Sequence, residues 1–205
     1  LKQGDIYMQL CEYDSAYSCY KRGETICDSS YSDYTRAKTI FDKKLGLEYR
    51  LNNKNKIAQI NIIKKRYDLA SRKLIIVLFI ANQNNLPSIK ADALKNYGYL
   101  YSSKSQYYEA LTKYFESKQI YIESGNKQGV VKCLYDIGTI YIAKSQPDSA
   151  IIYFNQSLEI IEKIRQTAPD EIRRDYLASQ IQTYQNLLSA YLRNNQPDSA
   201  FITSE

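Results

Sequence analysis

Apolar residues recur at helical spacing along most of the chain. Leu94, Tyr97 and Tyr101 stand three and four residues apart, which places them on one face of a helix. The same spacing returns 40 residues later at Leu134, Ile137 and Tyr141. Since we find no segment with the alternating pattern of a strand, the sequence predicts an all-α chain.

A short sequence and its surroundings are repeated. Gln-Pro-Asp-Ser-Ala stands at residues 146–150 and again at 196–200, and looser copies end at Ala16 and Ala110. A tyrosine stands nine residues before each final alanine, at Tyr7, Tyr101, Tyr141 and Tyr191. Three of these tyrosines follow a glycine by three residues, at Gly4, Gly98 and Gly138. Three of the alanines precede an aromatic residue by four residues, at Tyr20, Tyr114 and Phe154. A register this regular indicates tandem repeats.

Each repeat has the pattern of two helices joined by a turn. Gly98 and Gly138, in the first helix, let a neighbouring helix come close. Pro147 falls in the first turn of the second helix, where no N–H is needed. Asp148 beside it meets the positive end of the helix dipole. Ala150 is small, which suits a point where two helices cross.

These residues resemble the tetratricopeptide repeat, whose pattern joins a large apolar residue, an apolar–small pair, a tyrosine, an alanine and an aromatic residue at fixed offsets. The resemblance covers about residues 1–27 and 89–205. It implies a right-handed α-solenoid of helical hairpins that binds a protein or a peptide. Ala110 and Ala150 are 40 residues apart rather than the usual ~34, which is similar to the long repeats of bacterial signalling and transcriptional regulators.

We expect one solenoid domain over residues 1–205, with hairpins at about 1–27, 31–80, 89–123, 128–165 and 170–205. The second hairpin is degenerate: the polar run Asn52–Asn55 is predicted to interrupt it, and Ile60 to Leu74 to form one amphipathic helix. The last hairpin stops at Glu205 inside its second helix, so we expect the parent chain to continue. The start at Leu1 suggests a cut fragment or a mature form.

By this resemblance, the first helices of the hairpins line a concave groove, at the second, fifth, ninth and twelfth positions of each repeat. In the third hairpin these are Asp92, Lys95, Tyr99 and Ser102. In the fourth they are Lys132, Tyr135, Thr139 and Ile142. In the fifth they are Gln182, Gln185, Ser189 and Leu192. This mixed polar and aromatic surface is the predicted partner-binding site, and the alternative is a solvated face that binds nothing.

One subclass of the family holds a partner's C-terminal carboxylate with paired lysine and asparagine side chains. Lys95 and Lys132 occupy two of those positions. Tyr99 stands where that subclass has asparagine, and Asp136 where it has a cation. Binding of chaperone tails is therefore not expected.

The residue types offer little to catalysis. The chain has no histidine, the commonest general base and metal ligand. The four cysteines (Cys11, Cys19, Cys27 and Cys133) lack zinc-ligand spacing and are interpreted as small buried thiols. Neither a phosphate-binding glycine loop nor a nucleophile motif is present. We predict a protein that is not an enzyme and has no catalytic residue, metal or cofactor.

The net charge of +6 is concentrated in one segment. Residues 51–90 carry eight basic residues against a single acidic one, Asp68. Seven of the eight are predicted to decorate an amphipathic helix: Lys54, Lys56, Lys64, Lys65, Arg66, Arg72 and Lys73. The favoured interpretation is a solvated face, and the alternative is contact with nucleic acid, anionic lipid or an acidic partner.

The leading functional hypothesis is a protein- or peptide-binding module, the sensory or scaffolding region of a larger bacterial regulator. In that context a membrane helix and a signalling or DNA-binding domain would follow, and this region would be periplasmic. The alternatives are a cytoplasmic assembly scaffold and a binder of nucleic acid or anionic surfaces through residues 51–90. Reading the parent gene on both sides of the chain separates the first two.

Overall fold

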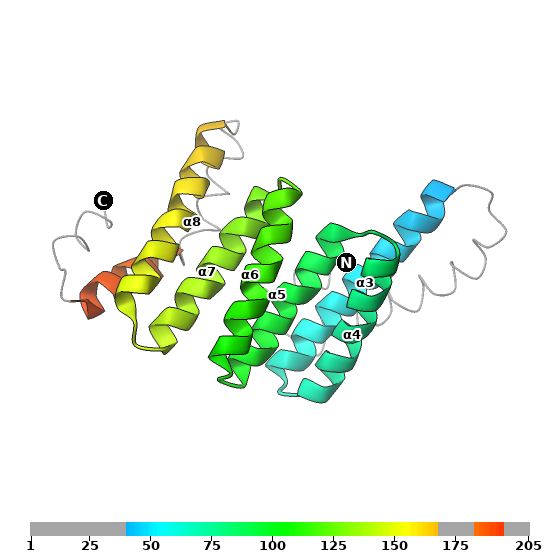
Figure 1. Ribbon diagram of the computed structural model, residues 1–205, viewed down its shortest axis with the longest axis horizontal. Coiled ribbons are helices and arrows are strands. Elements are labelled where there is room, and N and C mark those ends of the chain that lie inside the picture. Colours follow the sequence, from blue (N-terminus) through cyan, green and yellow to red (C-terminus); the bar gives the residue numbers. More distant parts are fainter. Residues whose placement is uncertain (1–39, 168–182, 195–205) are drawn as a thin grey trace. The chain divides into compact units, whose positions relative to one another are not determined.

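The computed structural model describes residues 40–167 and 183–194 (Figure 1). Its labelled helices are α3 (Ile40–Ile63), α4 (Tyr67–Gln83), α5 (Pro87–Ser103), α6 (Tyr107–Glu123), α7 (Lys127–Ala143) and α8 (Pro147–Thr167). A further helix spans residues 183–193. Within these two ranges there is no strand, which confirms the all-α prediction.

The turns between helices recur every 20 residues. One residue in each turn has a positive φ: Lys65, Asn85, Ser105, Gly125 and Ser145. The amide of the next residue donates back across the turn, as in the bonds Arg66 N to Asn61 O (2.7 Å) and Gln146 N to Tyr141 O (2.9 Å). A bond from an amide to the carbonyl five residues earlier is typical of a helix that ends in a residue with left-handed backbone conformation. The structure therefore has a 40-residue repeat made of two 20-residue halves.

The helix starts follow from local chemistry. Pro87 and Pro147 open α5 and α8, as their lack of an N–H allows. The Asn126 side chain accepts a hydrogen bond of 2.9 Å from the Gly129 amide and caps the start of α7. Asp148 lies in the first turn of α8, where its carboxylate favours the helix dipole, as predicted.

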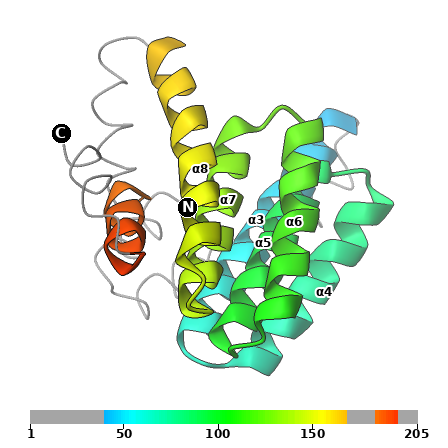
Figure 2. The same ribbon diagram turned by 60° about the vertical axis from the view of Figure 1, so that its left-hand side comes forward.

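The chain divides into two compact units, Leu1–Lys104 and Ser105–Glu205, and the boundary falls in the turn after α5. In the first unit, α3, α4 and α5 pack side by side (Figures 1 and 2). Their shared core contains Ala58 of α3, Leu74 of α4 and Ala93 of α5, all fully buried. The Tyr97 hydroxyl adds a bond of 3.2 Å to the Ser71 carbonyl, which ties α5 to α4.

In the second unit, α7 packs against both α6 and α8. Phe154 of α8 is fully buried against Gly138 of α7: a β-carbon added at this glycine would lie 2.6 Å from the Phe154 ring. Leu187 and Ala190 of helix 183–193 join Phe154 in one cluster. The small residue of the first helix thus admits the aromatic residue of the second, as the pattern predicts.

The boundary between α3 and α4 differs from the prediction. Asn52–Asn55 does not interrupt the second hairpin, because α3 runs unbroken through it to Ile63. Asn53 and Asn55 are buried rather than in a solvated turn. The span Ile60–Leu74 is not one helix either, since the turn at residues 64–66 divides it. The basic residues are therefore spread over α3, this turn and α4 rather than along one helix.

The remaining predictions are tested only within the described ranges. Cys133 is a buried free thiol, as expected, whereas Cys11, Cys19 and Cys27 lie outside those ranges. The first hairpin and most of the last also lie outside them, and the prediction of one solenoid domain over the whole chain stays a prediction. Among the helices described, none is long and apolar enough to cross a bilayer.

Candidate functional site

Four of the predicted groove residues share one face of α5. Asp92, Lys95 and Ser102 are half-buried, and Tyr99 is 39% exposed. We call these four residues the α5 face. Their neighbours Leu94 and Tyr97 are buried in the core, as the predicted register requires. The α5 face therefore offers both charges and an aromatic ring to solvent.

The helix beside α5 adds residues that the sequence analysis missed. Asn96 of α5 donates from its side-chain nitrogen to the Asn55 carbonyl and side-chain oxygens of α3, at 3.4 Å each. Asn52, Asn55 and Gln59 occupy on α3 the positions that Asp92, Lys95 and Tyr99 occupy on α5, 40 residues later. Asn52 and Gln59 are half-buried. Subtracting one repeat length would have found them, but the supposed break at Asn52–Asn55 hid the register.

Three further predicted residues share a face of α7. Lys132 and Thr139 are exposed, while Tyr135 is half-buried with its ring 6.0 Å from that of Phe154. The Thr139 hydroxyl donates to the Tyr135 carbonyl at 2.9 Å, so it is engaged by its own helix. Ile142, the next groove position, packs into the core cluster instead.

Helix 183–193 brings the next predicted residues beside α7. The Asn186 side-chain nitrogen donates to the Tyr135 hydroxyl at 3.0 Å and links the two helices. On this helix Gln185 is exposed, Ser189 is half-buried and Leu192 is 56% exposed. Gln182 lies outside the described residues. We call the set that these two helices contribute the α7 face: Lys132, Tyr135, Thr139, Gln185 and Ser189.

The Tyr135 phenol is kept protonated. Burial raises the pKa of Tyr135, and the hydrogen bond from Asn186 only partly opposes this; the nearby Asp136 raises it further. A phenol both donates and accepts, and here Asn186 already supplies a donor to its oxygen. The O–H proton can therefore be offered to an acceptor on a ligand, such as a peptide carbonyl.

A second network fixes helix 183–193 to α8. The Tyr184 hydroxyl donates to Glu162 at 2.8 Å, and Arg165 donates to the same carboxylate at 2.6 Å. Burial raises the pKa of Glu162, but these two hydrogen bonds and the charge of Arg165 together hold that pKa below its usual value. Burial and the bond to Glu162 raise the pKa of Tyr184 to about 12. The α7 face thus rests on a helix that polar contacts hold at both α7 and α8.

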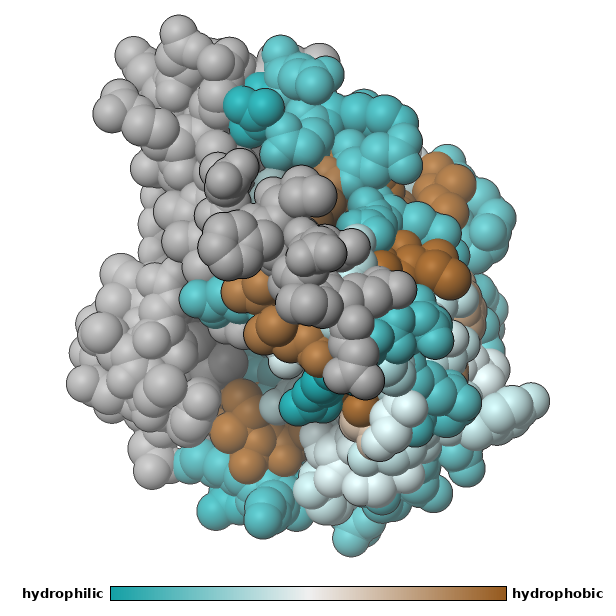
Figure 3. All heavy atoms as spheres, turned by 90° about the vertical axis from the view of Figure 1, so that its left-hand side faces the viewer, coloured by the Kyte–Doolittle hydropathy of each residue, from teal (hydrophilic) through white to brown (hydrophobic). Residues whose placement is uncertain are grey.

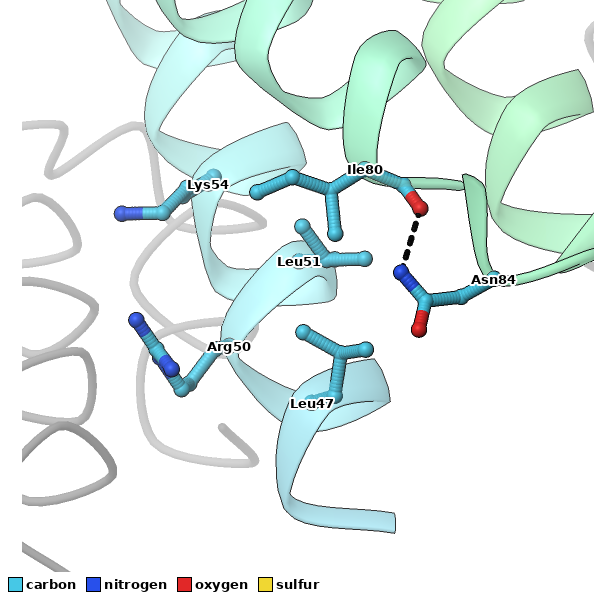
Figure 4. A pocket seen from close by; sticks show the side chains of 6 residues that line it. All are labelled: Leu47, Arg50, Leu51, Lys54, Ile80 and Asn84. Atoms are coloured by element: carbon cyan, nitrogen blue, oxygen red, sulfur yellow. Dashed lines mark hydrogen bonds between the residues drawn. The ribbon is translucent and has the colours of Figure 1, made fainter. Parts of the chain in front are cut away.

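Two pockets lie outside these faces. The first, of about 260 Å³, lies between α3 and α4. In Figure 4 its apolar wall is formed by Leu47, Leu51 and Ile80, while Arg50 and Lys54 extend away from Ile80. The pocket is smaller than the ~300 Å³ at which ligand sites usually begin. We therefore do not place the binding site there.

The second pocket, of about 350 Å³, lies where the end of α6 and the start of α7 meet α8. Its wall is mainly apolar, with Tyr121, Ile122 and Val130, and two lysines border it. None of its lining residues belongs to the α7 face. Figure 3 views the molecule from the side on which Figure 1 draws α8, and the apolar residues described there form separate groups between hydrophilic ones.

The arrangement is suited to binding. Within residues 40–167 and 183–194, no three Cys, Asp or Glu side chains are grouped so that they could hold a metal ion. What the α5 and α7 faces offer is hydrogen-bonding groups, single charges and aromatic rings on exposed helix surfaces. Such groups recognise a polar chain through hydrogen bonds, charge and aromatic contact.

The comparisons with known proteins agree with a fold built of helical repeats. Residues 90–163 match the sequence model of the tetratricopeptide repeat. A comparison with curated protein sequences finds no match. By fold the chain is an α-solenoid of helical hairpins, and its residues 90–163 carry the tetratricopeptide repeat.

Solved structures support the fold across most of the chain. BtubC (BKLC) from P. vanneervenii is 17% identical with a TM-score of 0.68, and the alignment covers 98% of this chain and 73% of that one. A kinesin light chain from Podosopora anserina, described by its nearly identical TPR-like repeats, is 15% identical with a TM-score of 0.60, over 98% and 88%. The apo form of RapI is 12% identical with a TM-score of 0.61, over 98% and 78%. These likenesses show the fold alone.

Proposed function

We propose that this protein binds a peptide segment of a partner protein through the α7 face in the second unit, with the α5 face of the first unit as a further contact surface. Tetratricopeptide repeats generally mediate contacts between proteins, and the repeats matched here include both α5 and α7. The single observation that carries the proposal is the Tyr135–Asn186 bond, which presents a protonated phenol between two adjacent helices.

The residues of the α7 face indicate the kind of peptide. The Tyr135 hydroxyl and the Gln185 amide supply donors to main-chain carbonyl groups. Lys132 supplies a positive charge on α7. Leu192, which lies beside the α7 face on helix 183–193, adds an exposed apolar side chain. We therefore expect an extended segment with an acidic group and an apolar residue near each other.

The test compares the parent chain with a variant that has lost both faces. Lys95→Ala, Tyr99→Ala, Lys132→Ala and Tyr135→Ala are combined in one chain, and partner capture from the source cell is quantified. We expect the captured partner to be lost while helical circular dichroism is retained. Shorter synthetic segments of that partner then test whether binding follows an acidic and apolar sequence.

The matched control replaces polar residues on second helices. Glu116→Ala and Gln156→Ala alter exposed positions of α6 and α8, outside both faces. They are expected to leave capture unchanged. If the four-residue variant and the control retain the partner equally, the site lies elsewhere and the assignment of both faces is wrong.

A finer proposal concerns the biological context. We propose that the chain is the sensory or scaffolding region of a larger bacterial regulator, which the 40-residue repeats at Ala110 and Ala150 support. A membrane anchor beside this region in the parent gene would make it periplasmic, whereas a chain without one would be a cytoplasmic scaffold. Sequencing the parent gene on both sides of the repeat region decides between the two.

A further inference from the structure

Helix α4 exposes large apolar side chains on the side facing away from its core. Leu69 is 47% exposed, Ile75 57%, Ile76 45% and Phe79 65%. Phe79 follows Ile75 by one helical turn, and Leu69 precedes Ile76 by two, so all four lie along one strip of the helix surface. We call these four residues the α4 strip. A helix that is apolar on both its inner and its outer side ordinarily has something covering the outer side.

The fold itself does not require an apolar outer side. The repeat length of 40 residues matches each position of α4 to one on α6 and one on α8. Leu69, Ile76 and Phe79 correspond on α6 to Glu109, Glu116 and Gln119, and on α8 to Ser149, Gln156 and Glu159. Ile75 corresponds to the half-buried Phe115 and the exposed Asn155. Three apolar positions of α4 are thus polar or acidic in both other second helices, which marks the α4 strip as a special feature of this hairpin.

The surroundings of the α4 strip are positively charged. Arg72 is exposed and lies one turn before Ile75 and Ile76 on the same side of α4. Lys65 and Arg66 are exposed in the turn that leads into the helix. Asp68 is the only acidic residue in residues 51–90. A surface that meets the α4 strip therefore has to accommodate apolar side chains and several cations together.

The combination of exposed apolar side chains and neighbouring cations discriminates between the kinds of partner that could bind the α4 strip. A nucleic acid offers phosphates to the cations but leaves Phe79 and Ile75 in water, so it gives no reason for the apolar residues. A dry protein interface would bury Arg72 among apolar side chains, which is costly without a dedicated carboxylate. A lipid surface satisfies both requirements, since acyl chains take up the apolar residues while headgroup phosphates lie at the level of the cations.

We propose that the α4 strip, together with Lys65, Arg66 and Arg72, docks on the surface of an anionic lipid bilayer. The helix would lie in the plane of the headgroups, with Phe79 and Ile75 inserted between the outer parts of the lipid chains. The strip spans the eleven residues from Leu69 to Phe79, whose Cα atoms extend over about 15 Å of helix. This contact would hold the repeat region against a membrane while the α7 face remains on another helix pair.

The test measures binding of the full 205-residue chain to vesicles by co-sedimentation. One set is phosphatidylcholine alone, and the other contains phosphatidylglycerol as well. The chain is expected to bind the anionic set, and Ile75→Ser with Phe79→Ser to weaken that binding by about tenfold or more. Because both side chains are exposed, the double variant is expected to keep its helical circular dichroism. Lys65→Gln, Arg66→Gln and Arg72→Gln together are expected to abolish the preference for anionic vesicles and its dependence on salt.

The matched control removes exposed apolar residues from the other second helices. Tyr108 of α6 is 81% exposed and Ile152 of α8 is 55% exposed. Tyr108→Ser with Ile152→Ser is expected to leave vesicle binding unchanged. Loss of binding in this control would show that general surface hydrophobicity, not the α4 strip, is responsible.

Several outcomes would overturn the proposal. One is that the parent chain does not bind anionic vesicles. Another is that the triple variant Lys65→Gln, Arg66→Gln, Arg72→Gln loses all binding while the double variant Ile75→Ser, Phe79→Ser loses none. A further one is that duplex DNA displaces the vesicles from the parent chain and binds the Ile75→Ser, Phe79→Ser variant as tightly as the parent, which would assign the surface to a nucleic acid. The last is that ultracentrifugation without lipid finds the parent to be a dimer and the Ile75→Ser, Phe79→Ser variant a monomer, which would assign the α4 strip to contact with a second copy of the chain. Peptide capture by the α7 face is measured separately, so either proposal can fail without the other.

Discussion

The two units build the same hairpin crossing from different residues. In the second unit Gly138 lies against Phe154, a fully buried aromatic ring. Two repeat lengths earlier, the first unit places Ala58 and Leu74 at the equivalent sites, both fully buried. A larger residue on the first helix is matched by a smaller one on the second. The repeat therefore conserves the filled volume at the crossing rather than the residue types.

Exchanging these pairs is the most severe test of that comparison. Gly138→Ala places a β-carbon 2.6 Å from the Phe154 ring and is expected to cost about 1–3 kcal/mol of unfolding free energy. Phe154→Leu alone is expected to cost a similar amount because it leaves a void. Combined, they recreate the Ala58–Leu74 pair, and the double variant is expected to be more stable than the sum of the two costs predicts.

Urea denaturation followed by circular dichroism measures all four corners of this cycle. Ala58→Gly in the first unit serves as the comparison, since it removes volume without introducing a clash. Additive costs for Gly138→Ala and Phe154→Leu would contradict the volume-matching interpretation, because residues in contact should couple.

The same comparison explains which parts of the fold could be predicted from the sequence. The register of α5, α7 and α8 is marked by Pro147, by glycines and by tyrosines, so their positions follow from spacing alone. In the first unit the equivalent residues are Ala58 and Leu74, and Asn61 stands where later repeats have tyrosine. The turn there has Lys65 at the left-handed position, a residue type that gives no turn signal. The polar run Asn52–Asn55 was therefore predicted to separate the two helices of this hairpin, but its asparagines lie inside α3.

Of the candidate site, too, one part could be predicted from the sequence and another could not. The residues of the α7 face could be named from the repeat register, because their positions depend only on helix periodicity. The Asn186–Tyr135 bond could not, since it depends on how two helices 51 residues apart meet. The α4 strip was missed for a further reason. With the α3–α4 boundary misplaced, Leu69 and Phe79 were not assigned to the outside of a separate helix.

A smaller effect is expected where polar contacts hold the second unit at its far helix. Tyr184→Phe removes the bond to Glu162 and is expected to cost about 1 kcal/mol near neutral pH, because water partly screens this half-exposed carboxylate. The pKa of Glu162 is lowered in the folded protein, so its contribution is present above the usual value of 4.5 and is lost as pH falls through the folded pKa.

The difference in unfolding free energy between parent and Tyr184→Phe should therefore shrink as the pH falls from 4.5 toward the folded pKa of Glu162. Urea titrations at a series of pH values measure it. Lys113→Ala, which removes the ion pair with Glu116 on the surface of α6 and leaves Tyr184 and Glu162 in place, is the matched control. A difference between parent and Tyr184→Phe that does not change with pH would mean that the phenol contributes by packing rather than through the carboxylate.

Effects of about 1 kcal/mol or less are expected in the turns, where the two units share one backbone geometry. Gly125 and Ser145 both have a left-handed φ, of 69° and 57°. A side chain in that region is strained, so Gly125→Ala is expected to destabilise the protein by about 1 kcal/mol. Ser145→Gly relieves the strain but gives the unfolded chain more freedom, which leaves a net gain of about 0.5 kcal/mol. Lys65→Gly should behave like Ser145→Gly if the first unit closes its hairpin in the same way. A loss of stability on Lys65→Gly, measured by thermal unfolding, would instead indicate that the lysine side chain makes a contact that outweighs its backbone strain.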